Sequence, residues 1–75
     1  MPEPFGGMTV FENVLVAVQQ GSGLRGKASY ATAAGILQLT GLDPDANSSA
    51  ERLGLLSRKR LELARALADQ PEAAA

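Results

Sequence analysis

The chain has 75 residues, a formal net charge of −1, and no cysteine, histidine or tryptophan. That length suits one small domain, and the composition excludes disulfide bonds, the usual zinc ligands and catalysis by Cys or His. No basic residues precede the first apolar run, and the run at 14–18 is far too short to span a bilayer, so we expect a soluble cytoplasmic protein.

Residues 1–8 contain two prolines and a Gly-Gly pair, and they are expected to form an irregular lead-in. Thr9 and Glu12 then have the spacing of a capping box. The apolar residues that follow at helical spacing are Phe11, Val14, Leu15 and Val18. The β-branched run at 14–18 favours a strand instead. Because the cap and the period agree, we predict a helix from Thr9 to about Gln20.

The glycine-rich stretch at 21–26 invites comparison with phosphate-binding loops. Its glycines fit the dinucleotide pattern G-x-G-x-x-G, and with Lys27 it nearly fits a Walker A loop. Both loops follow a β-strand, whereas the segment before this one is predicted to be helical. Ala28 also stands where a Walker A loop needs a magnesium-binding Ser or Thr. We therefore interpret 21–26 as a flexible linker.

A second helix is predicted from about Ser29 to Thr40, closed by Gly41 in the left-handed position that ends many helices. Gly35 inside it either weakens the helix or permits close packing against a neighbour. The residues expected to be buried are Tyr30, Ala33, Ala34 and Leu37, with Ile36 and Leu39 widening that face.

The last third of the chain contains a turn and a third helix. The DPD sequence at 43–45 is typical of a turn or of a short helix with proline at its first position, and 46–52 is polar and ambiguous. A helix is predicted from Ser57 until Gln70-Pro71 stops it, with 71–75 as a frayed tail. Its apolar face holds Leu61, Ala64, Leu67 and Ala68. The predicted fold class is all-α: a small bundle of three helices, with a short fourth at 43–46 as an option, in one helical domain at 9–70.

Three consecutive cations, Arg58, Lys59 and Arg60, are placed in the first turn of the third helix. Cations there are mildly unfavourable, because the N-terminal end of a helix carries partial positive charge. One interpretation is a solvated face on which Glu62 offsets cations three and four residues away. The other is that the helix end and its loop face an anion such as a phosphate.

Three segments resemble parts of one protein family, in the same order along the chain. RKRLELARALADQPE at 58–72 resembles the helix that follows the signature loop in the ATPase subunits of ABC transporters, and is most similar to subunits that serve branched-chain amino-acid importers. FGGMTVFENVLVA at 5–17 is similar to their segment after the Q-loop, and LQLTGLDPDA at 37–46 to their leucine-rich helix. The resemblance implies that the chain is the helical, signature-bearing subdomain of such a subunit.

The resemblance also implies that 53–57 takes the place of the signature loop, usually written LSGGQ. In the family this loop binds the γ-phosphate of ATP held by the opposite subunit. Gly54 stands where the family has Ser, and leucines replace the glycines that let the backbone approach closely. The implied site is therefore degenerate. Its implied nucleotide-binding residues are Leu53, Gly54, Leu55, Leu56, Ser57 and Arg58.

Phe5, Met8 and Phe11 fall where the family's subunits receive a coupling helix of the membrane permease, so the resemblance implies partner contact there. The other implied partners are the rest of the ATPase core and the second ATPase subunit, at the cytoplasmic face of the inner membrane. The Walker A loop, the Walker B strand and the catalytic Glu lie outside such a subdomain. We therefore expect no catalytic residue, no metal site, no cofactor and no ATP hydrolysis in this chain alone, with ATP and magnesium bound by the intact parent.

Two other function classes stay open. The first is a free-standing helical interaction module, whose apolar helix faces meet a protein partner. The second is a small phosphate or nucleic-acid binder that uses Arg58, Lys59 and Arg60. The net charge and the scarcity of aromatic residues disfavour the second class, so no nucleic acid is expected as a partner.

Overall fold

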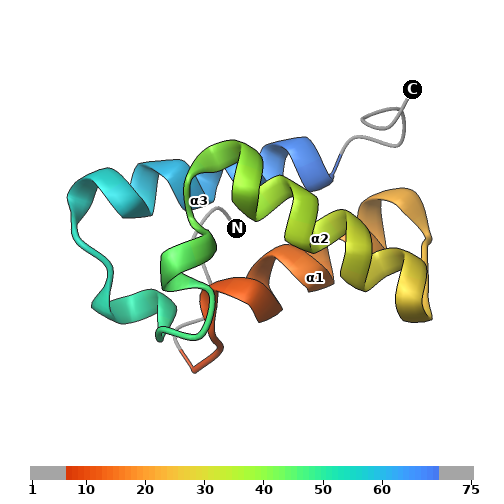
Figure 1. Ribbon diagram of the computed structural model, residues 1–75, viewed down its shortest axis with the longest axis horizontal. Helices are drawn as coiled ribbons and strands as arrows, with labels where there is room; N and C mark the ends of the chain where they lie inside the picture. Colours follow the sequence, from red (N-terminus) through yellow and green to blue (C-terminus); the bar gives the residue numbers. More distant parts are fainter. Residues whose placement is uncertain (1–6, 70–75) are drawn as a thin grey trace.

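The computed structural model describes residues 7–69, which form three α-helices and two short 3₁₀ helices. The elements are α1 (Val10–Ser22), α2 (Gly26–Thr40), η1 (Asp43–Asp45), η2 (Ala50–Arg52) and α3 (Leu55–Ala68). Each α-helix packs against the other two (Figure 1). The predicted all-α bundle is confirmed, and η1 is its short fourth element, with Pro44 in its first turn. The predicted helix stop at 70–71 and the tail lie outside the described residues.

Both bonds of the predicted capping box are present at the start of α1. The Thr9 amide donates to Glu12 Oε1 at 2.9 Å, and the Glu12 amide donates to Thr9 Oγ1 at 3.1 Å. The helix continues beyond its predicted end until Gly23 adopts the left-handed conformation and its amide donates to the Gln19 carbonyl. The prediction of a helix, and not a strand, at 14–18 is therefore confirmed.

The glycine-rich stretch is a shorter linker than the sequence predicts. Gly21 belongs to the last turn of α1 and Gly26 opens α2, so only 23–25 joins the two helices. Gly21 also faces the end of α3, where an added Cβ would lie 2.6 Å from Asp69 Cα and 2.8 Å from the Ala68 carbonyl oxygen. Its missing side chain therefore permits close helix packing. Because α1 precedes the stretch, the context of a phosphate-binding loop is absent.

The buried face of α2 is narrower than predicted. The buried residues are Ser29, Ala33, Ile36 and Leu37. Tyr30, Ala34 and Leu39 are exposed, which corrects the predicted face. The reason is geometric: α1 and α3 cover one stripe of the helix at i, i+4, i+7 and i+8, and the other apolar side chains fall outside it. Gly35 has open space around it, so it permits no close packing, whereas Gly41 closes the helix with φ +77° as predicted.

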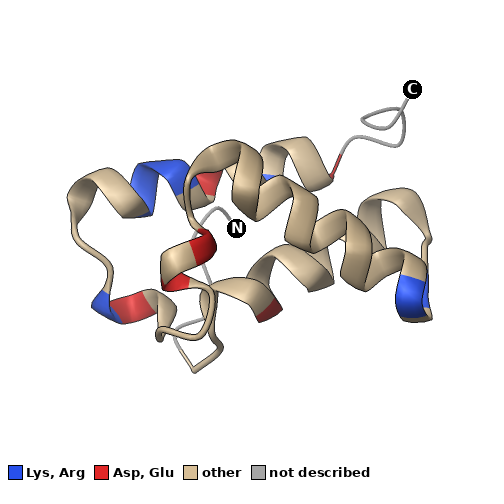
Figure 2. Cartoon of the chain, viewed as in Figure 1, with Lys and Arg blue, Asp and Glu red and all other residues tan. Residues whose placement is uncertain are grey.

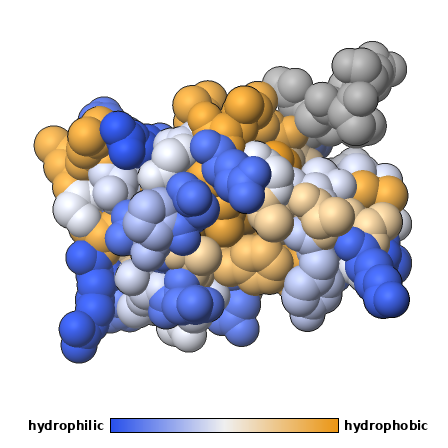
Figure 3. Space-filling view, in the orientation of Figure 1, coloured by the Kyte–Doolittle hydropathy of each residue, from blue (hydrophilic) through white to orange (hydrophobic). Residues whose placement is uncertain are grey.

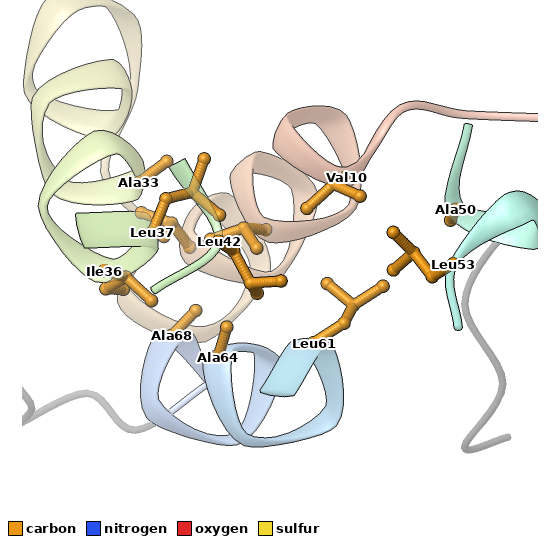
Figure 4. Packing of buried hydrophobic residues seen from close by; sticks show 12 residues of the cluster. Val10, Ala33, Ile36, Leu37, Leu42, Ala50, Leu53, Leu61, Ala64 and Ala68 are labelled. Carbon is orange, nitrogen blue, oxygen red and sulfur yellow. The ribbon is translucent and has the colours of Figure 1, made fainter. Parts of the chain in front are cut away.

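A single core lies between the three helices. Figure 4 shows side chains from α1, α2 and α3 turned toward one space, with Ala50 and Leu53 at one end of it. The buried apolar residues are Val10, Val14, Val18, Ala33, Ile36, Leu37, Leu42, Ala50, Leu53, Leu61, Ala64 and Ala68. On the face predicted for the third helix, Leu61, Ala64 and Ala68 are buried and Leu67 is half-buried.

The ambiguous stretch at 46–52 is folded onto the start of α1. The Val10 amide donates to the Ser48 carbonyl at 2.9 Å, and the Phe11 amide donates to the Ala46 carbonyl at 2.9 Å. These two bonds satisfy amides that a helix start leaves without an intrahelical partner. They also fix the stretch in place, and the stretch in turn positions η2 and the loop that leads into α3.

Candidate functional site

Free backbone hydrogen-bond donors gather at the start of α3. Gly54 caps the helix with extended backbone, φ −70° and ψ 175°, and makes no side-chain cap bond. The first helical hydrogen bond runs from the Arg58 amide to the Gly54 carbonyl at 2.9 Å. Among residues 7–69 the amides of 55–57 have no acceptor. These amides form the positive end of the helix dipole.

A polar hollow of about 430 Å³ lies beside this helix start. The residues that line it are Asp45, Ser48, Ser49, Arg52, Leu53, Gly54 and Ser57. Serine hydroxyls, a guanidinium and helix-end amides all donate hydrogen bonds, which suits an oxyanion. The Asp45 carboxylate opposes an anion. The hollow is therefore a donor-rich pocket whose affinity for an anion is reduced by one acidic side chain.

The three helix starts differ in how their first amides are satisfied. α2 also begins without a side-chain cap bond, so free amides alone do not mark a site. At α1 the situation is the reverse, because Thr9 Oγ1 and the carbonyls of Ala46 and Ser48 occupy the amides of its first turn. The start of α3 therefore differs from that of α1, because its donors are free, and a polar hollow adjoins them.

The structure brings together half of the implied signature residues. Leu53, Gly54 and Ser57 line the hollow, and the Leu53 side chain is buried in the core, which anchors the loop. Leu55 and Leu56 are 73% and 62% exposed and lie outside that lining, as does Arg58. The two ends of the loop thus line the hollow, while the two leucines between them are exposed to solvent.

The lining residues Asp45, Ser48, Ser49 and Arg52 are absent from the site that the sequence predicts. They come from η1, from η2 and from the turn between them, and tertiary packing brings them to the start of α3. The only sequence signal for them is a polar run between two apolar residues, Leu42 and Leu53, both of which are buried.

The predicted position of the three cations is corrected by the true start of α3. The helix begins at Leu55 and not at Ser57, so Arg58, Lys59 and Arg60 occupy its fourth to sixth positions. All three are exposed, and within residues 7–69 no ion pair joins them to Glu62. The first three positions, whose amides are free, therefore carry no charged side chain.

The residues implied to contact a permease lie apart from the hollow. Met8 and Phe11 are half-buried, and the Phe11 ring packs against the Tyr30 ring with centroids 5.6 Å apart. This aromatic pair joins α1 to α2, so the Phe11 ring already has a structural contact. Phe5 lies outside the described residues.

Two kinds of site find no support in the part of the chain that the structure describes. No group of three or more acidic, His or Cys side chains is placed to hold a metal ion. No helix there has the length and apolar character needed to cross a membrane.

Comparison of the chain with protein-family models and with curated proteins finds no match.

Proposed function

We propose that the chain acts as the signature-bearing helical subdomain of an ABC-transporter ATPase subunit, of the type that drives import of branched-chain or similar amino acids. The observation that carries the proposal is the set of free amides at 55–57, beside a donor-rich hollow. These amides fall in the segment that takes the place of the signature loop, directly before the helix whose sequence resembles that of the family. In this role the segment meets a nucleotide held by a second ATPase subunit.

Under this proposal the backbone does most of the binding. The amides of 55–57 and the Ser57 hydroxyl donate hydrogen bonds to phosphate oxygens at the positive end of the helix dipole. ATP and magnesium are held by the partner subunit, and this chain supplies no base and no metal ligand. Leu55 and Leu56 limit how closely the phosphate approaches, since the family has glycine at both positions. We therefore propose that the chain binds the nucleotide weakly and supports only slow ATP turnover by the assembled subunits.

A chimeric transporter tests the proposal. Residues 9–69 would replace the helical subdomain of an importer's ATPase subunit. We expect the chimera to co-purify with its permease and to hydrolyse ATP slowly. The double change Leu55→Gly and Leu56→Gly should raise turnover about tenfold or more, because oxyanion donors that reach their target contribute on that scale. Leu63→Gly on the same helix is the matched control and should give no increase.

Two results with the chimera would contradict the proposal, and so would one result with the chain alone. One is a chimera that folds, as shown by circular dichroism, and yet fails to bind the permease. The other is ATP turnover that is equal with leucine and with glycine at 55 and 56. ATP hydrolysis by the purified chain alone would also contradict it, because the proposal assigns no catalytic group to these residues.

A helical interaction module is the second candidate function. The exposure of two large apolar side chains on α2, Tyr30 at 55% and Leu39 at 77%, favours it. A protein partner covering these residues would remove them from water. Light scattering that detects a specific complex, lost in Leu39→Ser, would support this candidate over the first.

A further inference from the structure

α3 is apolar on two opposite sides. Its inner side packs into the core through Leu61, Ala64 and Ala68. Its outer side, which we define as Leu55, Leu56, Lys59, Glu62, Leu63 and Ala66, recurs at i, i+1, i+4, i+7, i+8 and i+11 and is exposed throughout. The three leucines are 73%, 62% and 54% exposed. Figure 3 shows apolar surface along the edge of the molecule that α3 forms.

The outer side of α3 is also basic. Lys59 lies within the apolar stripe and Arg58 flanks it, whereas the Arg60 guanidinium lies beside Gly41 at the end of α2. α3 carries one carboxylate, Glu62, and within residues 7–69 no ion pair neutralises the three cations. Figure 2 shows Lys and Arg on the first half of α3, followed by an acidic residue, Glu62, on the same helix.

Folding does not account for this arrangement. Exposed leucines gain nothing from packing in the core. An exposed apolar patch mixed with uncompensated cations is typical of a surface that binds something both apolar and anionic.

We propose that the outer side of α3 docks on an anionic lipid surface. The three leucines enter the boundary between headgroups and acyl chains, as in other amphipathic helices that lie on membranes. The alkyl stems of Arg58 and Lys59 pack beside the leucines, while their charged ends reach the lipid phosphates. The stripe from Leu55 to Ala66 is about 16 Å long, at 1.5 Å per residue.

Charge and packing favour a lipid surface over other occupants. A second copy of the chain, paired outer side to outer side, would bring the cations of both copies together. A partner that enfolds a basic helix in a groove needs access all round it, and the inner side of α3 is already buried against α1 and α2. A flat anionic surface needs access from one side only.

Vesicle flotation with the full chain tests this proposal. We expect binding to phosphatidylcholine vesicles that contain about one third phosphatidylserine, little binding to phosphatidylcholine alone, and weakening as salt rises. Lys59→Gln and Arg58→Gln should each lower the partition coefficient about fivefold. Leu56→Ser with Leu63→Ser should lower it at least as much. The matched control is Lys27→Gln, an exposed cation in α2, which should leave binding unchanged.

Several results would overturn the docking proposal. They are no binding to phosphatidylserine vesicles at low salt by chain that circular dichroism shows to be helical, equal loss of binding in Lys27→Gln, and binding to soluble polyglutamate without binding to vesicles. The last result would assign the surface to an acidic protein. The docking proposal does not depend on the proposed transporter function, because the chimera's response to glycine at 55 and 56 tests that function separately.

Discussion

Glycine has opposite roles at two helix positions that look alike in the sequence. Gly21 lies where the backbones of α1 and α3 approach, and an added Cβ would be within 2.8 Å of three backbone atoms of Ala68 and Asp69. Gly35 lies on an exposed part of α2, with nothing within 4 Å of an added Cβ. At the first position the missing side chain permits packing. At Gly35 the missing side chain only increases the conformational entropy of the unfolded chain.

The pair Gly21→Ala and Gly35→Ala should therefore change stability in opposite directions. Gly21→Ala forces α1 away from the end of α3 and should lower the free energy of unfolding by about 1–3 kcal/mol. Gly35→Ala restores helix propensity and should raise it by about 0.5–1 kcal/mol. Urea titration followed by far-UV circular dichroism measures both. A gain of stability in both variants would show that the helices do not meet at Gly21.

At the scale of the element, the sequence predicts those features that depend on neighbours within four residues. The capping box of α1 and the left-handed Gly41 are both of this kind, and both are confirmed. The sequence does not predict features that depend on how the other elements pack. The buried stripe of α2 depends on where α1 and α3 lie, so Tyr30 was placed on the wrong face. The polar hollow likewise joins residues from three elements, of which the sequence predicts only the loop at 53–57.

The starts of α1 and α3 give a contrasting pair of variants. Thr9→Ala removes the hydroxyl that accepts the Glu12 amide, and should cost about 1 kcal/mol of unfolding free energy. Gly54→Asp adds the cap that α3 lacks. Gly54 has φ −70° and open space for a Cβ, so the change should stabilise the chain by about 0.5 kcal/mol.

The same urea titration measures these two variants, with Gly54→Ala as the control for the side-chain oxygen. Loss of stability in Gly54→Asp relative to Gly54→Ala would mean that the amides of 55–57 already have acceptors. In the chimera, Gly54→Asp should also lower ATP turnover, since the added carboxylate would compete with phosphate for the same donors.

At the scale of the whole molecule, the three helices share one core. Buried residues come from every α-helix and from η2, and together they form one cluster. A domain of this size has a small free energy of unfolding. Unfolding should therefore be cooperative, and a cavity-forming substitution at the centre of the core should destabilise every helix.

Leu61 and Leu63 test that expectation on one helix. The Leu61 side chain is fully buried where α3 meets the core, whereas Leu63, two residues on, is 54% exposed. Leu61→Ala leaves a cavity and should cost about 2–5 kcal/mol, which approaches the whole stability of a small domain. Leu63→Ala should cost less than about 0.5 kcal/mol. Amide hydrogen exchange should show α1, α2 and α3 losing protection together in Leu61→Ala. Loss confined to α3 would mean that α1 and α2 fold as an independent pair.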